Sequence, residues 1–173
     1  GLDYGDDTFI VATSGRCEYR NKGIDMYLDA ISALAAAGLK RRVLAFVMVP
    51  AWCAGPRSDL AHSLAMDERS RLADPLLTHN LHNYNDDPVN RRMHELGFAN
   101  DAASGVSVIY VPCYLDGQDG IFNLTYYELL PGLDATVFPS YYEPWGYTPL
   151  ESLGLFVQHV AVTHVRALVG QVL

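Results

Sequence analysis

Short apolar runs alternate with longer amphipathic segments along the chain. Runs rich in β-branched residues occupy positions 8–13, 43–49, 106–111 and 135–139. Each has the length and composition of a buried strand. The segments between these runs show helical spacing of apolar side chains. This alternation predicts an α/β fold, with a Rossmann-like, mostly parallel sheet flanked by helices.

Helix signals lie between the predicted strands. Residues 24–37 place apolar side chains at three- and four-residue steps, and Gly38 ends the pattern. Pro88 behind Asp87 predicts a helix start with an aspartate N-cap. Further helical stretches are expected at about residues 59–72, at 126–130 and from Thr148 through about 157, with a possible strand at 160–165.

Two polar loops directly follow predicted strands. Residues 14–23 (S-G-R-C-E-Y-R-N-K-G) follow the first strand, and residues 139–151 (P-S-Y-Y-E-P-W-G-Y-T-P-L-E) follow the fourth. Parallel strands end at the same edge of a sheet, and ligands of open α/β sheets bind at that edge. We therefore expect the two loops to lie together and to form a binding site.

The charge balance restricts the kind of ligand. The 173 residues include 12 Lys and Arg against 20 Asp and Glu, a formal charge of -8. This argues against a nucleic-acid backbone or an anionic membrane surface as the main partner. Arg16, Arg20 and Lys22 nevertheless gather in the first loop, just before a helix N-terminus. Either they hold an anion there, or they belong to a solvated turn and pair with neighbouring carboxylates.

The second loop combines aromatic and acidic residues. Thr148, Pro149 and Glu151 fit a capping box, with threonine as N-cap and glutamate three residues on. Glu143 has no such local role. It lies in an aromatic stretch that suits a sugar ring, although aromatic packing in the core is the alternative. The aromatic residues are Tyr141, Tyr142, Trp145 and Tyr147.

Two further features bear on location. Cys17, Cys53 and Cys113 are far apart and odd in number, which is typical of a reducing compartment. The apolar stretch at 153–165 is shorter than the roughly 20 residues needed to span a bilayer, and the N-terminus shows no signal-peptide pattern. A cytoplasmic location is expected.

Two motifs resemble the C-terminal domain of the glycogen synthases of glycosyltransferase family 3. They are G-R-C-E-Y-R-N-K-G-I-D-M-Y-L-D-A from Gly15 and F-P-S-Y-Y-E-P-W-G-Y-T-P-L-E-S from Phe138. The second contains Glu143 and Glu151 separated by seven residues, like the E-x-7-E motif of retaining glycosyltransferases with the two-domain GT-B fold. The likeness extends over about residues 8–152, including P-L-L-T-H-N and T-Y-Y-E-L-L.

The resemblance implies one Rossmann-like nucleotide-sugar-binding domain over residues 1–173, the C-terminal half of a GT-B enzyme and incomplete at both ends. The missing acceptor-side domain implies that the chain alone is inactive. A short 54–73 region favours a bacterial-type member. Residues 153–173 depart from the family pattern and are expected to be an aberrant or truncated tail.

Site roles are implied at matching positions. Arg16 and Lys22 would hold the donor diphosphate and stabilise the departing nucleotide, and Glu143 would orient the transferred glucose. The remaining residues are expected to bind substrate: Tyr126 would stack on uracil, Glu151 would bind the ribose, backbone amides of Trp145, Gly146 and Tyr147 would assist Glu143, and the helix at Thr148 would point its N-terminus at the phosphates.

The implied reaction moves glucose from UDP-glucose to the non-reducing end of an α-1,4-glucan, with retention of configuration. No cofactor or metal is implied. His79 and His82 with Asp86 and Asp87 only superficially resemble a metal cluster, because a loop H-x-x-H lacks helical spacing. Two alternatives stay open: a non-catalytic nucleotide-sugar or glucan-binding remnant, and a GT-B glucosyltransferase that uses ADP-glucose.

Overall fold

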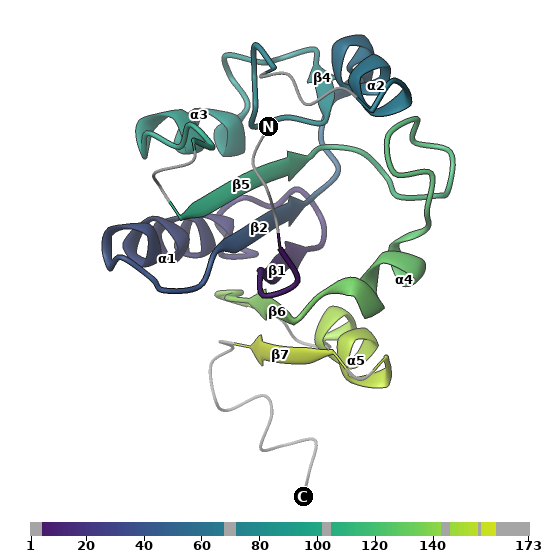
Figure 1. Cartoon of the computed structure of the whole chain (residues 1–173). Coiled ribbons are helices and arrows are strands. Elements are labelled where there is room, and N and C mark those ends of the chain that lie inside the picture. Colours follow the sequence, from purple (N-terminus) through teal and green to yellow (C-terminus); the bar gives the residue numbers. More distant parts are fainter. Residues whose placement is uncertain (1–4, 68–71, 102–104, 143–145, 156, 162–173) are drawn as a thin grey trace, which may run out of the picture.

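A five-stranded parallel sheet forms the centre of the computed structural model, which describes residues 5–67, 72–101, 105–142, 146–155 and 157–161 (Figure 1). The strands follow the order β5-β2-β1-β6-β7, and each neighbouring pair is parallel. Their bounds are β1 (Phe9–Ser14), β2 (Val43–Met48), β5 (Val106–Val111), β6 (Ala135–Phe138) and β7 (Gln158–Ala161). The predicted fold class is confirmed.

Among the described residues the helices are α1 (Ile24–Ala36), α2 (Ser58–Ala65), α3 (Pro88–Glu95), α4 (Tyr126–Leu129) and α5 (Tyr147–Gly154), with a 3-10 turn, η1 (Leu130–Gly132), after α4. Side-chain caps start α3 and α4, whereas the described N-caps of the other three helices make no side-chain cap hydrogen bond. The Asp87 side chain accepts a hydrogen bond from the Asn90 amide, so the predicted cap of α3 is confirmed. At α4, Thr125 and Glu128 form a reciprocal capping box that the sequence reading missed.

Alternate strand residues form two cores, one on each face of the sheet. Val11, Ala45 and Val108 lie in register across β1, β2 and β5 and pack with apolar residues of α1 and α3. Their neighbours Ala12 and Phe46 belong to a smaller core that includes Tyr126 of α4. Successive side chains of a strand point to opposite faces, so α1 and α3 cover one face and α4 the other.

Three segments differ from the sequence expectations. β3 (Cys53–Pro56) and β4 (His79–Leu81) form a short antiparallel pair in segments where no strand was predicted, because three or four residues carry no readable alternation. The helix expected to reach residue 72 ends at Ala65, since Asp67 adopts a left-handed φ of 51°. The helix expected through 157 ends at Gly154. β7 follows from Gln158 and overlaps the strand expected at 160–165 only in its first two residues, the others lying outside the described residues.

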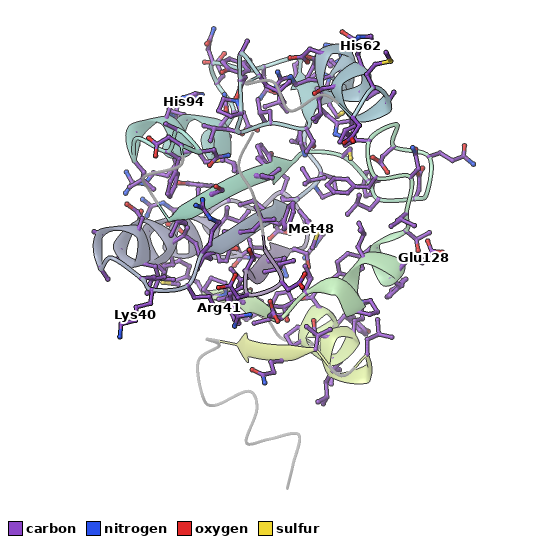
Figure 2. The ribbon with its side chains drawn as sticks, viewed as in Figure 1. Lys40, Arg41, Met48, His62, His94 and Glu128 are labelled. Atoms are coloured by element: carbon purple, nitrogen blue, oxygen red, sulfur yellow. The ribbon has the colours of Figure 1, made fainter. Side chains whose placement is uncertain are left out.

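Lys40 and Arg41 precede β2 and therefore lie at the amino-terminal edge of the sheet (Figure 2). A ligand at the carboxyl-terminal edge must rely on the cations of the loops there.

None of the helices in the described ranges combines the length and the apolar character needed to cross a bilayer.

Candidate functional site

The two polar loops meet at the carboxyl-terminal edge of the sheet, as predicted. The Tyr141 amide donates a hydrogen bond to the Asn21 carbonyl, at an N to O distance of 2.9 Å. Gly23, at the end of the first loop, lies directly against the backbone of Pro139. β1 and β6 are adjacent parallel strands, so their following loops emerge side by side and this contact holds them together.

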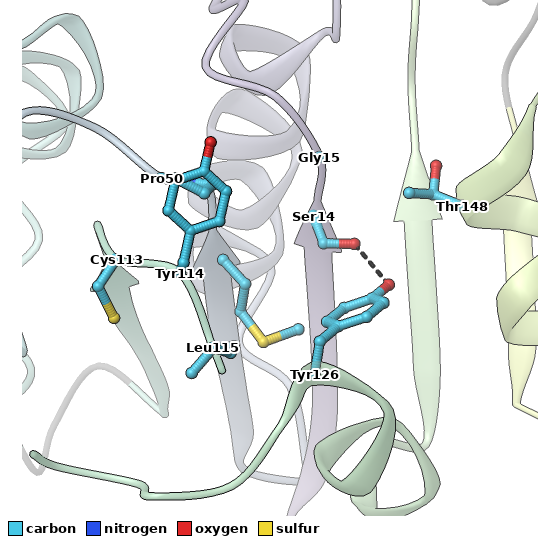
Figure 3. A pocket seen from close by; sticks show the side chains of 9 residues that line it. Ser14, Gly15, Pro50, Cys113, Tyr114, Leu115, Tyr126 and Thr148 are labelled. Carbon is cyan, nitrogen blue, oxygen red and sulfur yellow. Dashed lines mark hydrogen bonds between the residues drawn. The ribbon is translucent and has the colours of Figure 1, made fainter. Parts of the chain in front are cut away.

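A hollow of about 200 Å³ opens at the same edge (Figure 3). Its walls come from the ends of β1, β2 and β5, from α4 and from α5. The lining residues are Ser14, Gly15, Met48, Pro50, Cys113, Tyr114, Leu115, Tyr126 and Thr148. Mostly apolar walls with a few hydroxyl groups are typical of a small-molecule site.

Tyr126 forms one wall of this hollow. Its hydroxyl and that of Ser14 share a hydrogen bond of 2.8 Å. Burial is the main cause that raises the pKa of Tyr126, so the side chain is a neutral phenol near pH 7. The capping box at Thr125 fixes the start of α4, and the Ser14 contact fixes the ring, so Tyr126 presents a preoriented aromatic surface.

Arg16 and Lys22 belong to the first loop, whereas Arg20 of the same loop lies beside Arg91 and Arg92 of α3. Arg16 is 79% exposed and pairs with Glu18 at 3.0 Å, as the solvated-turn interpretation expects. This exposed ion pair contributes little stability, so the Arg16 guanidinium can leave Glu18 and bind an anion of higher charge. The methylene chain of Lys22 lies 4.0 Å from where a Cβ at Gly15 would stand, and Gly15 lines the hollow.

The capping box predicted at Thr148 and Glu151 is wrong. α5 begins at Tyr147, and its N-cap is Gly146, two residues before Thr148, in a left-handed conformation with φ 57° and no side-chain cap hydrogen bond. Glycine permits this tight entry, which places Thr148 in the first turn beside the hollow. The Glu151 carboxylate is therefore not a cap. Its Oε1 accepts a hydrogen bond from the Tyr127 hydroxyl at 2.8 Å.

The aromatic residues of the second loop point to solvent where the structure describes them. Tyr141, Tyr142 and Tyr147 are all more than half exposed. The alternative of a loop packed into the core is therefore wrong for these three side chains. The two remaining predicted site residues, Glu143 and Trp145, lie outside the described residues.

Sequence reasoning missed Ser14 and Tyr127, which hold Tyr126 and Glu151 respectively. Neither residue gives a periodic signal, because Ser14 is a single hydroxyl at the end of a strand and Tyr127 is a second tyrosine beside a predicted binding residue. The only available signal was position, since Ser14 opens the first loop and Tyr127 neighbours Tyr126.

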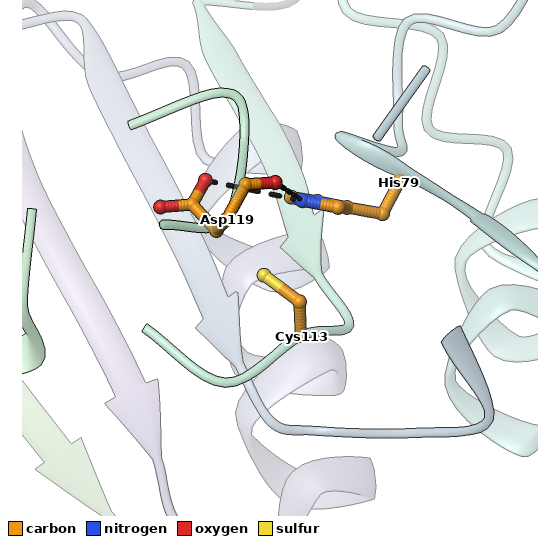
Figure 4. Close-up of side chains that lie close together, drawn as sticks. All are labelled: His79, Cys113 and Asp119. Atoms are coloured by element: carbon orange, nitrogen blue, oxygen red, sulfur yellow. Dashed lines mark hydrogen bonds and ion pairs between the residues drawn. The ribbon is translucent and has the colours of Figure 1, made fainter. Parts of the chain in front are cut away.

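A separate cluster joins His79, Cys113 and Asp119, whose possible ligand atoms lie within 4.8 Å of one another (Figure 4). Within the described residues, the structure thus groups His79 with these partners and not with His82 or Asp87. The His79 ring is buried between the Asp119 carbonyl and the Thr78 hydroxyl, each at 2.8 Å. Burial raises the pKa of the Cys113 thiol to about 12.

The Asp119 carboxylate accepts hydrogen bonds from the amides of Ile121, Phe122 and Asn123 at 2.8–3.0 Å. A metal ion bound through His79 Nε2 would have to displace the contact with the Asp119 carbonyl, and it would need the thiolate of Cys113. The hydrogen bonds already account for the burial of the cluster. Its role in this structure is to clamp the loop between β5 and α4 onto β4.

Asp119→Ala is expected to destabilise the fold by about 2 kcal/mol, because three amides lose a charged acceptor. Asp116→Ala is the matched control, since Asp116 accepts from a single amide, that of Gln118, and should cost less than about 1 kcal/mol. Urea unfolding followed by circular dichroism compares the two. Equal effects would contradict the clamp, and stabilisation of the unaltered chain by added zinc would indicate a metal site.

Comparison with known proteins identifies the family. The model of the family described as glycogen synthase matches residues 60–165, more than half of the chain and including β7. Glycogen (starch) synthase isoform 1 of Saccharomyces cerevisiae is 27% identical over 208 residues, covering 84% of this chain. The enzyme of Dictyostelium discoideum is 30% identical over 199 residues, with the same coverage.

Human liver glycogen (starch) synthase is 26% identical over 209 residues, covering 87% of the chain. The chain spans only 29% of the yeast and human relatives and 23% of the Dictyostelium relative. The chain belongs to the glycogen synthase family.

Proposed function

We propose that this chain is the donor-binding half of a glycogen synthase, a retaining hexosyltransferase. The donor would be UDP-glucose, and the acceptor would be the non-reducing end of an α-1,4-glucan such as glycogen. The observation that carries the proposal is the joined pair of loops at the edge of the sheet where the hollow walled by Tyr126 opens. Arg16 and Lys22 belong to the first loop, and Glu151 follows the second loop on α5. The relatives' names support the choice of reaction.

Each part of the edge suits one part of the donor. The aromatic face of Tyr126 suits the uracil base, which has a π-face for stacking. Glu151, one turn into α5, suits the ribose hydroxyls. The amino end of α5 carries partial positive charge, which favours the diphosphate. Glu143, with the amides of Trp145, Gly146 and Tyr147, would orient the transferred glucose.

Arg16 and Lys22 would stabilise the negative charge that grows on the diphosphate as it leaves. In the reaction we propose, the bond from the anomeric carbon to the phosphate oxygen breaks. The acceptor hydroxyl forms its bond to that carbon from the same side, and its proton passes to the departing phosphate oxygen. Retention follows, and no second carboxylate is needed at the anomeric carbon, unlike in the two-carboxylate scheme of retaining hydrolases.

The glucan acceptor would be held by an acceptor-side domain that faces this edge, and the chain without that domain would not turn over. A cytoplasmic location completes the proposal, since cysteine usage favours a reducing compartment. All three cysteines are free thiols in the structure.

Calorimetric titration of the chain with UDP and, separately, ADP tests the donor assignment. Saturable binding of UDP in preference to ADP is expected, because the base must fit against Tyr126. Preference for ADP would indicate an ADP-glucose enzyme. Failure of a folded sample to bind either nucleotide would contradict a donor site in this chain and favour the alternative of a non-catalytic, glucan-binding remnant.

A further inference from the structure

Tyr127 connects α4 with α5 through a side-chain hydrogen bond. It lies on α4, immediately after Tyr126, and its hydroxyl donates to Glu151 Oε1 on α5 at 2.8 Å. The rings of Tyr126 and Tyr127 meet edge to face, with centroids 5.5 Å apart. The Ser14 hydroxyl completes the series of contacts at the end of β1.

The hydrogen bond restricts a side chain that would otherwise be free to rotate. Glu151 has lost the capping role that its spacing suggested, so Tyr127 is the group that orients its carboxylate. The hydrogen bond to Glu151 is the main cause that raises the pKa of Tyr127, so the phenol keeps its proton at neutral pH and remains a donor. Oε1 is engaged, and Oε2 can accept a hydrogen bond from a ligand hydroxyl.

We propose that Tyr127 is a positioning residue: by holding Glu151 Oε1 it presents Oε2 to a ribose hydroxyl, and thereby gives the site its preference for ribonucleotides over deoxyribonucleotides. This inference rests on the proposed donor site, in which Glu151 faces the ribose. Tyr127 itself is more than half exposed and does not line the hollow, so it acts through Glu151.

The test compares UDP with 2′-deoxy-UDP and 3′-deoxy-UDP by calorimetry, in the unaltered chain and in Tyr127→Phe. In the unaltered chain, removal of the hydroxyl that faces Glu151 should weaken binding about tenfold or more, as expected for a hydrogen bond to a charged group. In Tyr127→Phe, the affinity for UDP should fall toward that of the deoxy analogue, so that the difference shrinks to about threefold or less. The affinity for the deoxy analogue itself should change little.

Tyr84→Phe is the matched control. Tyr84 also donates to a carboxylate, Asp74 Oδ2 at 2.9 Å, but it contacts α3 and not the site. This variant should keep the full preference for UDP.

The outcomes separate the inference from the function on which it rests. A tenfold preference for UDP that survives in Tyr127→Phe would overturn the positioning role and leave the donor site intact. An equal loss of affinity for all three ligands in Tyr127→Phe would also overturn it, because that pattern reports general disorder of α4. An unaltered chain that does not bind UDP, or does not distinguish the deoxy analogues, would overturn the role of Glu151 at the ribose and the inference with it.

Discussion

Gly23→Ala is expected to destabilise the fold by about 4 kcal/mol or more and to abolish nucleotide binding. A Cβ at this position would stand 1.9 Å from the Pro139 carbonyl oxygen and 2.6 Å from its carbon. Both atoms are backbone, so no side-chain rotation relieves the overlap. The left-handed φ of 63° adds about 1–2 kcal/mol of strain for any residue with a Cβ. Urea unfolding monitored by circular dichroism gives the free-energy change.

Gly38→Ala separates the clash from the strain. Gly38 has a similar φ of 68° at the end of α1, but a Cβ there would meet nothing within 4 Å. This control should cost only about 1–2 kcal/mol. Equal effects at the two glycines would mean that the loops after β1 and β6 do not press against each other, and the basis of the proposed site would be lost.

Gly23 also shows how far the sequence alone could lead. The alternation of strands and helices predicts the parallel sheet, and parallel strands place the two loops at one edge. The same pattern says nothing of the contact between Gly23 and Pro139. That contact depends on the adjacency of β1 and β6, which are far apart in the chain, and sheet order is set by tertiary packing.

At Glu151 the sequence predicts a local contact that the structure does not form. Its spacing from Thr148 fits a capping box, and a local interpretation was reasonable. The structure instead uses Gly146 as N-cap, two residues before Thr148, and this left-handed glycine starts α5 at Tyr147. The cap motif that does form, at Thr125 and Glu128, has the same three-residue spacing. Local motifs therefore identify candidates, and the backbone at the helix entry decides between them.

The sequence pattern also could not predict the short strands or the buried polar contacts. β3 and β4 are too short for a periodic signal, and their pairing places His79 beside the loop of Asp119. Only the folded chain shows that His79 belongs with Cys113 and Asp119 and that His82 instead stacks against Trp52.

Replacing both Arg16 and Lys22 by alanine is expected to weaken UDP binding about a hundredfold while leaving the binding of uridine unchanged within about twofold. Each cation would donate to the diphosphate, and a hydrogen bond between charged groups contributes about 1.5–3 kcal/mol. Uridine has the same base and ribose but no phosphate, so it reports on Tyr126 and Glu151 alone. Calorimetry with both ligands gives the ratio of affinities, which is the quantity that the two cations should control.

Loss of two positive charges from an acidic chain could weaken any anion's binding without a specific contact. Lys40→Ala with Arg41→Ala removes the same charge from exposed positions at the amino-terminal edge of the sheet, just before β2. Salt screens charges that lie more than about 10 Å apart at 0.1 M, so this control should keep UDP affinity within about twofold. If the control loses as much affinity as the site variant, the first loop is a solvated turn, as the Arg16–Glu18 pair suggests. If only the site variant loses affinity, and only for the phosphate-bearing ligand, then Arg16 and Lys22 contact the diphosphate, because general attraction cannot distinguish one edge of the sheet from the other.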